Sequence, residues 1–179
     1  MRIITGKYKG RRFDVPRSFK ARPTTDFAKE NLFNVLRAYV DFEEISVLDL
    51  FGGTGSISLE FLSRGCQPVV CVEKDRQHAS FLQQLFRSLN DNNLHLVQGD
   101  ALRYVERGVG SFDLVFADPP YQLRELGELP TRVLNSTCLK DGGIFVLEHG
   151  KDYDFKDMPQ FFEHRAYGSV NFSFFRKPI

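Results

Sequence analysis

Apolar runs typical of buried strands alternate with runs of helical periodicity along most of the chain, and this alternation constrains the fold more than any other feature. The strand-like runs are residues 46–51, 68–73, 94–100, 112–118 and 142–149, and the helical patterns between them are residues 56–64, 75–90 and a segment within 123–138. Strands that alternate with helices pair in the same direction, so the pattern predicts a mostly parallel sheet in an α/β fold.

The two ends of the chain extend this core. Residues 26–40 place apolar side chains on one helical face, with a threonine available as the N-cap. The tail, residues 161–177, alternates in polarity and predicts two antiparallel strands joined at Gly168-Ser169. The sequence thus predicts a seven-stranded, mostly parallel sheet flanked by helices and closed by an antiparallel strand.

The composition is that of an ordinary globular protein, with 42% apolar and 26% charged residues in a chain of 179. No apolar run approaches the length of a membrane span, and the N-terminus lacks the apolar core of a signal peptide. We therefore expect a cytoplasmic protein that makes no use of a membrane. The cysteines, Cys66, Cys71 and Cys138, form no CxxC pair, so we expect reduced thiols in or near the core and no metal site.

Charge is distributed unevenly along the chain. Residues 1–22 carry a net charge of +7 and the remainder carries −6, although the whole chain is close to neutral at +1. A basic segment on an acidic body favours contact with a polyanion, while a solvated tail explains the composition equally well. Its apolar residues and two turn-forming glycines, Gly6 and Gly10, predict a short basic β-hairpin. We therefore divide the chain into a hairpin extension, 1–22, and a globular domain, 23–179.

A glycine-rich loop follows the first strand of the α/β pattern, in the stretch "DLFGGTGS" at residues 49–56. In such folds a ligand binds outside the carboxyl ends of the strands, and Gly52, Gly53 and Gly55 allow it to approach the backbone closely. The loop lacks the third glycine of GxGxxG and the Gly-Lys-Ser/Thr of a Walker A loop. By itself, therefore, it does not identify the ligand.

Acidic residues at successive strand ends narrow the choice of ligand. Asp49 precedes the glycine loop, Glu73 ends the second strand where an acid can accept bonds from ribose hydroxyls, and Asp100 ends the third strand within reach of an adenine amino group. Such acids would repel a pyrophosphate and suit a ligand with a cationic end, such as S-adenosylmethionine. Helix capping is the alternative interpretation of these acids.

Several motifs in this order resemble the Rossmann-like class I methyltransferases. They are "VLDLFGGTGSISLEFLSRG", "VEKD", "GDA" and "DLVFADPPY". The blocks "MRIITGKYKGRRFDVP", "RPTTDFAKENLFNVL" and "YGSVNFSFF" resemble one family in particular, the RsmD-type bacterial 16S rRNA (guanine-N2)-methyltransferases. The resemblance covers nearly the whole chain. Two positions depart from the family pattern: Gly52 stands where alanine is more usual, and Phe27 where the family often has a basic residue.

The resemblance assigns expected roles to residues outside the catalytic motif. It implies S-adenosylmethionine as the cofactor, with 16S rRNA or the small ribosomal subunit as the partner. The expected cofactor-binding residues are Asp49, Gly52, Gly53, Gly55, Glu73, Asp100 and Ala101. The expected RNA-binding residues are Lys7, Lys9, Arg11, Arg12 and Arg22.

The stretch "FADPPYQ" supplies the residues that we expect to act on the substrate. An exocyclic base amine is a poor nucleophile because its lone pair is delocalised, and methyl transfer requires that nitrogen to become tetrahedral. Asp118 and the carbonyl of Pro119, held by the ring of Pro120, offer two acceptors for the N–H groups, and Tyr121 offers a flat face for an extruded base. An ordinary proline-rich turn is the alternative, which the glycine loop upstream makes less favoured.

These observations predict an S-adenosylmethionine-dependent RNA methyltransferase that acts on an exocyclic base amine. The family resemblance implies guanine N2 in small-subunit rRNA. An adenine-N6 methyltransferase of DNA or RNA is the alternative among enzymes, because DPPY alone does not separate the two amines. A non-catalytic rRNA-binding assembly factor on the same fold is the alternative from another class, although a pure binder needs neither the glycine loop nor DPPY.

Overall fold

The computed structural model describes residues 1–19 and 24–179 of the chain. Its centre is a seven-stranded sheet with the strand order β3-β2-β1-β4-β5-β7-β6, in which β1 to β5 are parallel and β7 pairs antiparallel with both β5 and β6. The strands are β1 Val47–Asp49, β2 Val69–Glu73, β3 Leu94–Gln98, β4 Phe112–Ala117, β5 Leu139–His149, β6 Phe161–Tyr167 and β7 Val170–Arg176. The predicted fold class, including the closing antiparallel strand, is confirmed.

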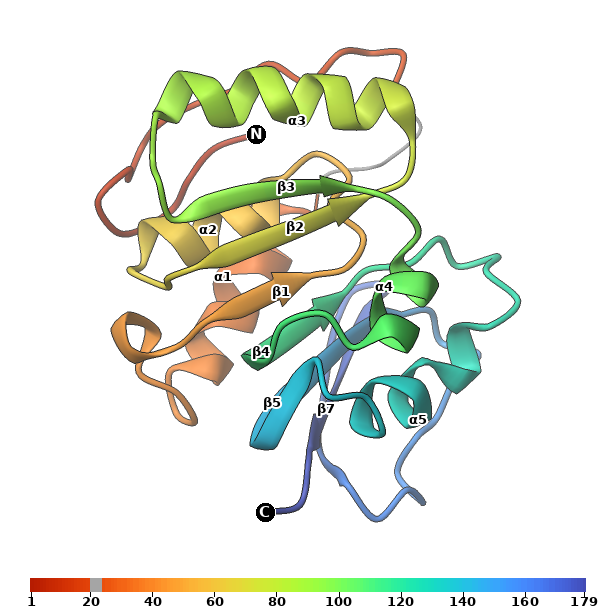
Figure 1. Cartoon of the computed structure of the whole chain (residues 1–179). Coiled ribbons are helices and arrows are strands. Elements are labelled where there is room, and N and C mark those ends of the chain that lie inside the picture. The colour runs from red at the N-terminus through yellow and green to blue at the C-terminus, as the bar shows by residue number, and fades with distance from the viewer. Residues whose placement is uncertain (20–23) are drawn as a thin grey trace.

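Helices cover both faces of the sheet (Figure 1). They are α1 Asp26–Leu36, α2 Ser56–Ser63 and α3 Arg76–Leu89 on one face, and α4 Ala101–Arg107 and α5 Leu129–Leu134 on the other. Short 3-10 turns, η1 Phe42–Glu44 and η2 Leu126–Glu128, complete the set. Successive strand residues serve opposite faces: Val47 packs with the α1–α3 layer and Leu48 with the α4–α5 layer. The strands are thus buried on both sides, which explains their continuous apolar runs.

Three helices differ from the sequence-based expectation. The first ends at Leu36, four residues before the predicted end, and the helix expected within 123–138 is limited to Leu129–Leu134. The helix α4, Ala101–Arg107, was not predicted at all. It is short and buries only Ala101 and Val105, so its sequence carries too few apolar positions to show a helical period.

The basic N-terminal segment forms the predicted hairpin, with one antiparallel bridge between Arg2 and Arg12. The hairpin packs against α2. Its Ile4 and Thr5 amides donate to the Glu60 carboxylate at 2.9 and 3.0 Å, and farther along, the Lys7 amide donates to the Ser63 carbonyl at 2.8 Å. The hairpin therefore follows α2 from end to end.

A buried cation fastens the start of the hairpin. Lys29 of α1 is only 1% exposed, and its Nζ donates to the Arg2 carbonyl at 2.6 Å and to Ser56 Oγ at 3.0 Å. The carboxylate of Glu60 lies 3.5 Å from the same Nζ. A buried charge needs such partners to offset its desolvation, so this cluster fixes the hairpin to α1 and α2. It also places Arg2 beside the first residue of α2, at the glycine loop.

Candidate active site

Three acids follow one another across the carboxyl ends of the central strands. Asp49 is the last residue of β1, Asp118 follows β4, and Glu148 is the penultimate residue of β5. The strands β4 and β5 are parallel neighbours with Ala117 opposite Leu147, which sets Asp118 level with Glu148 on adjacent strands. Neighbouring strands lie about 4.8 Å apart, so the three carboxyl groups lie close together at the carboxyl ends of these strands.

Two of these acids have an oxygen that remains open. Asp49 is 1% exposed and accepts a hydrogen bond from Ser58 Oγ at 2.7 Å on Oδ2, and Glu148 is 6% exposed and accepts one from the Tyr121 hydroxyl at 3.4 Å on Oε2. Asp49 Oδ1 and Glu148 Oε1 find no donor in the described part of the chain, and we call them the open oxygens. Buried acceptors rarely lack a donor, because the free-energy cost of their desolvation is then not offset by a hydrogen bond.

The environment of the three acids raises the pKa of each. Burial raises the pKa of Asp49 to about 7, with a further rise from the charge of Glu73. Burial, and then the Glu148 carboxylate beside it, raise the pKa of Asp118 well above its usual range. Burial also raises the pKa of Glu148. A ligand that brings hydrogen-bond donors or positive charge stabilises the carboxylate forms of these acids, so the carboxyl ends of the central strands favour the binding of such a ligand.

Glu148 was missed by the sequence-based prediction. The signal was nonetheless present, because an acid at the end of "GGIFVLE" repeats the pattern of Asp49 at the end of "SVLD" and Asp118 at the end of "FDLVFAD". Recognising it requires the pairing of β4 with β5, since only that register brings Glu148 beside Asp118.

The glycine loop takes the tight path that its sequence predicts. Gly53 and Gly55 have φ values of 56° and 82°, in the left-handed region that favours glycine. Gly55 stands at the N-cap of α2 and has no side chain to cap the first amides. The Ser58 amide in this first turn donates to the Asp49 carboxylate, which ties the start of α2 to the end of β1.

Glu73 braces this loop. Its Oε1 accepts a hydrogen bond from the Gly53 amide and its Oε2 accepts one from the Asp75 amide, both at 2.8 Å. The spacing from Gly53, which suggested a ribose contact, therefore has a structural use as well. The predicted ribose contact is compatible with it, because a carboxylate accepts more than two hydrogen bonds.

The departure from the family at Gly52 has a local cause. A Cβ at this position would lie 2.3 Å from Cys71 Sγ and 3.3 Å from a Leu82 methyl group. The sulfur thus fills the volume that an alanine side chain would take. Cys71, like Cys66 and Cys138, is buried and free, in agreement with the predicted reduced thiols.

Asp100 caps the helix that the sequence did not reveal. Its Oδ1 accepts a hydrogen bond from the Arg103 amide at 3.1 Å, and its Oδ2 lies 3.4 Å from Lys74 Nζ. Burial acts against ionisation of Asp100, but these partners prevail and lower its pKa. The capping interpretation is therefore correct for Asp100, while its contact with adenine, and that of the buried Ala101, stay predictions.

Tyr121 presents an aromatic face beside the acids. It is 44% exposed, and its ring packs over Gly150, where an added Cβ would lie 3.4 Å from the ring. Pro119 is buried and Pro120 is exposed. The motif therefore combines a fixed backbone with an accessible ring, as a site for a planar base requires.

An exposed aromatic ring at the start of α1 contacts a half-buried ring of the β6–β7 hairpin. Phe27 is 66% exposed and meets Tyr167, at the end of β6, edge to face with ring centroids 5.9 Å apart. The hairpin of β6 and β7 thus reaches α1. Where the family often has a basic residue, this chain carries part of an aromatic surface.

The predicted RNA-binding cations fall into two groups. Lys7 Nζ lies 2.7 Å from Asp91 Oδ2, which leaves its charge paired. Lys9, Arg11 and Arg12 are exposed, and residues 1–19 and 24–179 contain no carboxylate within ion-pair distance of them. Arg22 lies outside the described residues.

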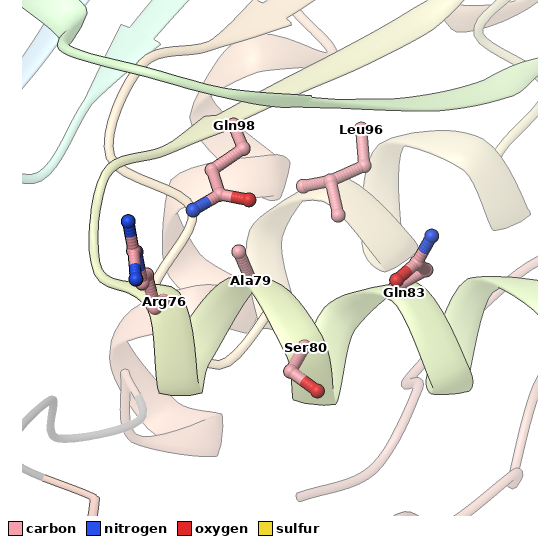
Figure 2. A pocket seen from close by; sticks show the side chains of 6 residues that line it. All are labelled: Arg76, Ala79, Ser80, Gln83, Leu96 and Gln98. Atoms are coloured by element: carbon pink, nitrogen blue, oxygen red, sulfur yellow. The ribbon is translucent and has the colours of Figure 1, made fainter.

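One further hollow lies away from these acids. A cavity of about 490 Å³ separates α3 from β3, and Figure 2 shows Gln98 and Leu96 of β3 directed toward the helix. The residues that line it are Arg76, Ala79, Ser80, Gln83, Leu96 and Gln98. None of them is a predicted site residue.

The described residues hold no group of three or more His, Cys, Asp or Glu side chains suited to a metal ion. Among the helices of this same part of the chain, none combines the length and the apolar character needed to cross a bilayer.

The groups at the carboxyl ends of the central strands match those of S-adenosylmethionine. The cofactor offers an ammonium, a sulfonium and ribose hydroxyls. The protein offers an open oxygen on Asp49, the N-terminus of α2 and the Glu73 carboxylate, all gathered around a loop whose glycines allow close approach. Acids and amides in this order match a ligand with both cationic and anionic ends.

Comparison with known proteins places the chain in a family. Residues 1–176 match the family described as "Conserved hypothetical protein 95". The ribosomal RNA small subunit methyltransferase D of Escherichia coli (strain K12) is 32% identical over 148 residues, which cover 83% of this chain and 74% of that protein.

Solved structures show the same fold. The putative methyltransferase yhhF from Escherichia coli superimposes with a TM-score of 0.85 at 27% identity, covering 99% of this chain and 98% of that chain. An RNA methyltransferase from Salinibacter ruber, solved in complex with S-adenosyl-L-homocysteine, has a TM-score of 0.67 at 15% identity and covers 88% of this chain and 94% of that chain. The chain therefore belongs to the RsmD-type family of S-adenosylmethionine-dependent methyltransferases.

Proposed function

We propose that this protein transfers a methyl group from S-adenosylmethionine to the exocyclic N2 amine of a guanine in 16S rRNA. The observation that carries the proposal is the row of crowded acids, Asp49, Asp118 and Glu148, whose open oxygens adjoin the glycine loop and Tyr121. Its relative in Escherichia coli carries the name of a small-subunit rRNA methyltransferase, which supports the choice of RNA.

When bound, the cofactor supplies an electrophilic methyl group on its sulfonium. The residues that would hold it are those around the loop: Asp49 for the ammonium, Glu73 for the ribose, and Asp100 with Ala101 beside the adenine. The brace from Glu73 to the Gly53 amide keeps Gly53 in place before the ligand arrives, so little ordering is left to binding.

The DPPY residues would act on the base. Asp118 and the Pro119 carbonyl would accept the two N–H groups of the amine, which favours a tetrahedral nitrogen aligned with the methyl group. Tyr121 would stack on the extruded base, with its hydroxyl anchored on Glu148. Once the N–H donors of the bound base favour the carboxylate form of Asp118, this group would also be placed to receive the proton that the amine releases.

The hairpin extension, 1–22, would add sequence-independent contacts to RNA phosphates alongside the methyltransferase domain, 23–179. The backbone of Arg12 pairs with that of Arg2, whose guanidinium is held by Asp26 at 2.6 Å, so the cations open to RNA are the exposed Lys9, Arg11 and Arg12. Both naked 16S rRNA and the small ribosomal subunit would present phosphates to these exposed cations. With either substrate, we place the protein in the bacterial cytoplasm.

The test is methyl transfer by the purified protein. Labelled S-adenosylmethionine is supplied with naked 16S rRNA or with small-subunit particles from cells that lack the enzyme, and the RNA is digested to nucleosides. We expect N2-methylguanosine as the labelled product, at one position, and at least about a hundredfold slower labelling with Asp118→Ala. Label in N6-methyladenosine would favour the adenine alternative, and tight RNA binding without transfer would favour the assembly factor.

A further inference from the structure

We infer that Glu148 is a specificity residue that accepts the ring N1–H of the target base and so selects guanine over adenine. The inference rests on the proposed function, because it concerns which base the DPPY residues receive. It starts from the open Oε1 of Glu148, a buried acceptor that has no donor in the described chain apart from the neighbouring carboxyl group of Asp118.

The location of Glu148 assigns it to the base and not to the cofactor. Its other oxygen accepts from the Tyr121 hydroxyl at 3.4 Å, and its strand neighbour across β4 is Asp118. Asp49, which carries the second open oxygen, is instead bonded to Ser58 of α2 at 2.7 Å, on the side of the glycine loop. The two open oxygens therefore serve different ligands.

The next residue along β5 shows what a merely structural polar group looks like here. His149 is fully buried, and both of its ring nitrogens have partners at 2.7 Å, the Ser173 hydroxyl and the Gly150 carbonyl. Glu148 is almost as buried but keeps one oxygen open. Packing alone therefore accounts for His149 and not for Glu148.

The chemistry of the two candidate bases differs at the position that Glu148 would meet. The Watson–Crick edge of guanine presents hydrogens on N2 and, beside them, one on N1. Asp118 and the Pro119 carbonyl would take the N2 hydrogens, which leaves the N1 hydrogen for a further acceptor. Adenine presents an amine beside an unprotonated N1, whose lone pair would face the Glu148 carboxylate. A donor left unpaired or two acceptors forced together both reduce binding, so this position discriminates.

The experiment compares RNAs that keep the N2 amine and lose the N1 hydrogen, with two analogues that differ at C6 to control for the accompanying loss of the O6 carbonyl. The guanine mapped by the product analysis is replaced by 2-aminopurine or by 2,6-diaminopurine, both of which carry the amine but have an unprotonated N1. For the wild-type protein we expect kcat/KM to fall by about 10- to 100-fold on these RNAs, the effect of losing a hydrogen bond to a charged group. For Glu148→Gln the difference between guanine and either analogue should shrink to a few fold, because the amide also donates to an unprotonated N1.

A matched control separates base reading from the support of Tyr121. Tyr121→Phe removes the hydroxyl that Glu148 holds and leaves Glu148 in place, so it should keep the wild-type preference for guanine. If Glu148→Gln transfers too slowly to measure, affinities of the same RNAs are compared in the presence of S-adenosyl-L-homocysteine, where the preference needs no turnover.

Three results would overturn the inference. A wild-type preference retained by Glu148→Gln would show that Glu148 only supports the site. A preference lost equally in Tyr121→Phe would assign the effect to the tyrosine. In both cases guanine N2 is still methylated and the proposed function stands. Methylation of adenine by the wild-type protein would overturn the proposed function and the inference together.

Discussion

Two groups of acids lie at the carboxyl ends of the strands, and they differ in their hydrogen-bond partners. One group follows the outer strands β2 and β3, and the other lies at the central strands β1, β4 and β5. Glu73 and Asp100 accept hydrogen bonds from the amides of Gly53, Asp75 and Arg103. The central acids instead crowd together and leave the open oxygens without donors from the described chain. The outer acids thus build the site, and the central acids are held ready for hydrogens that the ligands bring.

This difference predicts opposite effects of neutralising one acid of each kind on the stability of the ligand-free protein. Burial raises the pKa of Asp49 from 3.8 to about 7, so the folded protein keeps a proton that the unfolded chain has already released. Stability is therefore lost as pH rises from about 4 to about 7, by up to about 4 kcal/mol. We expect Asp49→Asn to raise the free energy of unfolding at pH 8 and to have little effect at pH 4.

Asp100→Asn is the matched comparison. The pKa of Asp100 is lowered in the folded protein, so its contribution to stability is present at neutral pH and is lost as the pH falls. The asparagine should therefore give no gain at pH 8 and a small loss. Urea denaturation at both pH values checks the pair, and a loss of stability in Asp49→Asn at pH 8 would contradict the comparison.

The second prediction concerns turnover. Asp118→Ala should lower methyl transfer by a factor on the order of 10² to 10³, the usual cost of removing a group that stabilises the transition state. Cofactor affinity should stay near wild type, because Asp118 is proposed to contact the amine only. Asp118→Asn should be milder, since its amide oxygen still accepts one N–H.

Single-turnover transfer of a labelled methyl group, on naked rRNA and on small-subunit particles, measures this effect, with calorimetry of cofactor binding as the control. Near wild-type transfer by a folded Asp118→Ala protein would remove Asp118 from the chemistry.

The third prediction tests an outer acid. Glu73→Ala removes the bond from the Gly53 amide that braces the glycine loop and the bond from the Asp75 amide at the start of α3, together with the proposed ribose contact. The dissociation constant for S-adenosyl-L-homocysteine should rise by about 10- to 100-fold. Glu73→Gln should fall between, because its one side-chain oxygen can serve only one of the two amides. Unchanged affinity in Glu73→Ala, measured by calorimetry, would exclude Glu73 from the cofactor site.

Much of this site could be predicted from sequence because its parts are local. The glycine loop, the DPPY turn and the acids that end apolar strands are each read from a few adjacent residues, and Asp49, Glu73 and Asp118 were all predicted. Glu148 and the capping role of Asp100 were harder. The first depends on which strands pair, and the second on a helix, α4, with only two buried positions.

The hairpin shows the same limit. Its turn and its basic character follow from the glycines and lysines, but its position along α2 depends on two acids distant in sequence, Glu60 and Asp91. Sequence reasoning treated all its cations alike. The structure separates Lys7, whose charge is already paired, from Lys9, Arg11 and Arg12.

Paired and unpaired cations of the hairpin should differ in their contribution to RNA binding, because a cation already paired with a carboxylate gains less from a phosphate. Replacing Lys9, Arg11 and Arg12 together by glutamine should weaken RNA binding and reduce the salt dependence, as the slope of log affinity against log salt, by about 2 to 3. Lys7→Gln should change the slope by less than about 1, since Asp91 already neutralises the charge at 2.7 Å. Cofactor affinity should be unchanged in both variants. Binding to the same rRNA fragment across a range of salt concentrations measures both slopes. An unchanged slope in the triple variant would mean that the exposed cations are merely solvated, and equal slopes per charge in the two variants would mean that RNA displaces Asp91 from Lys7.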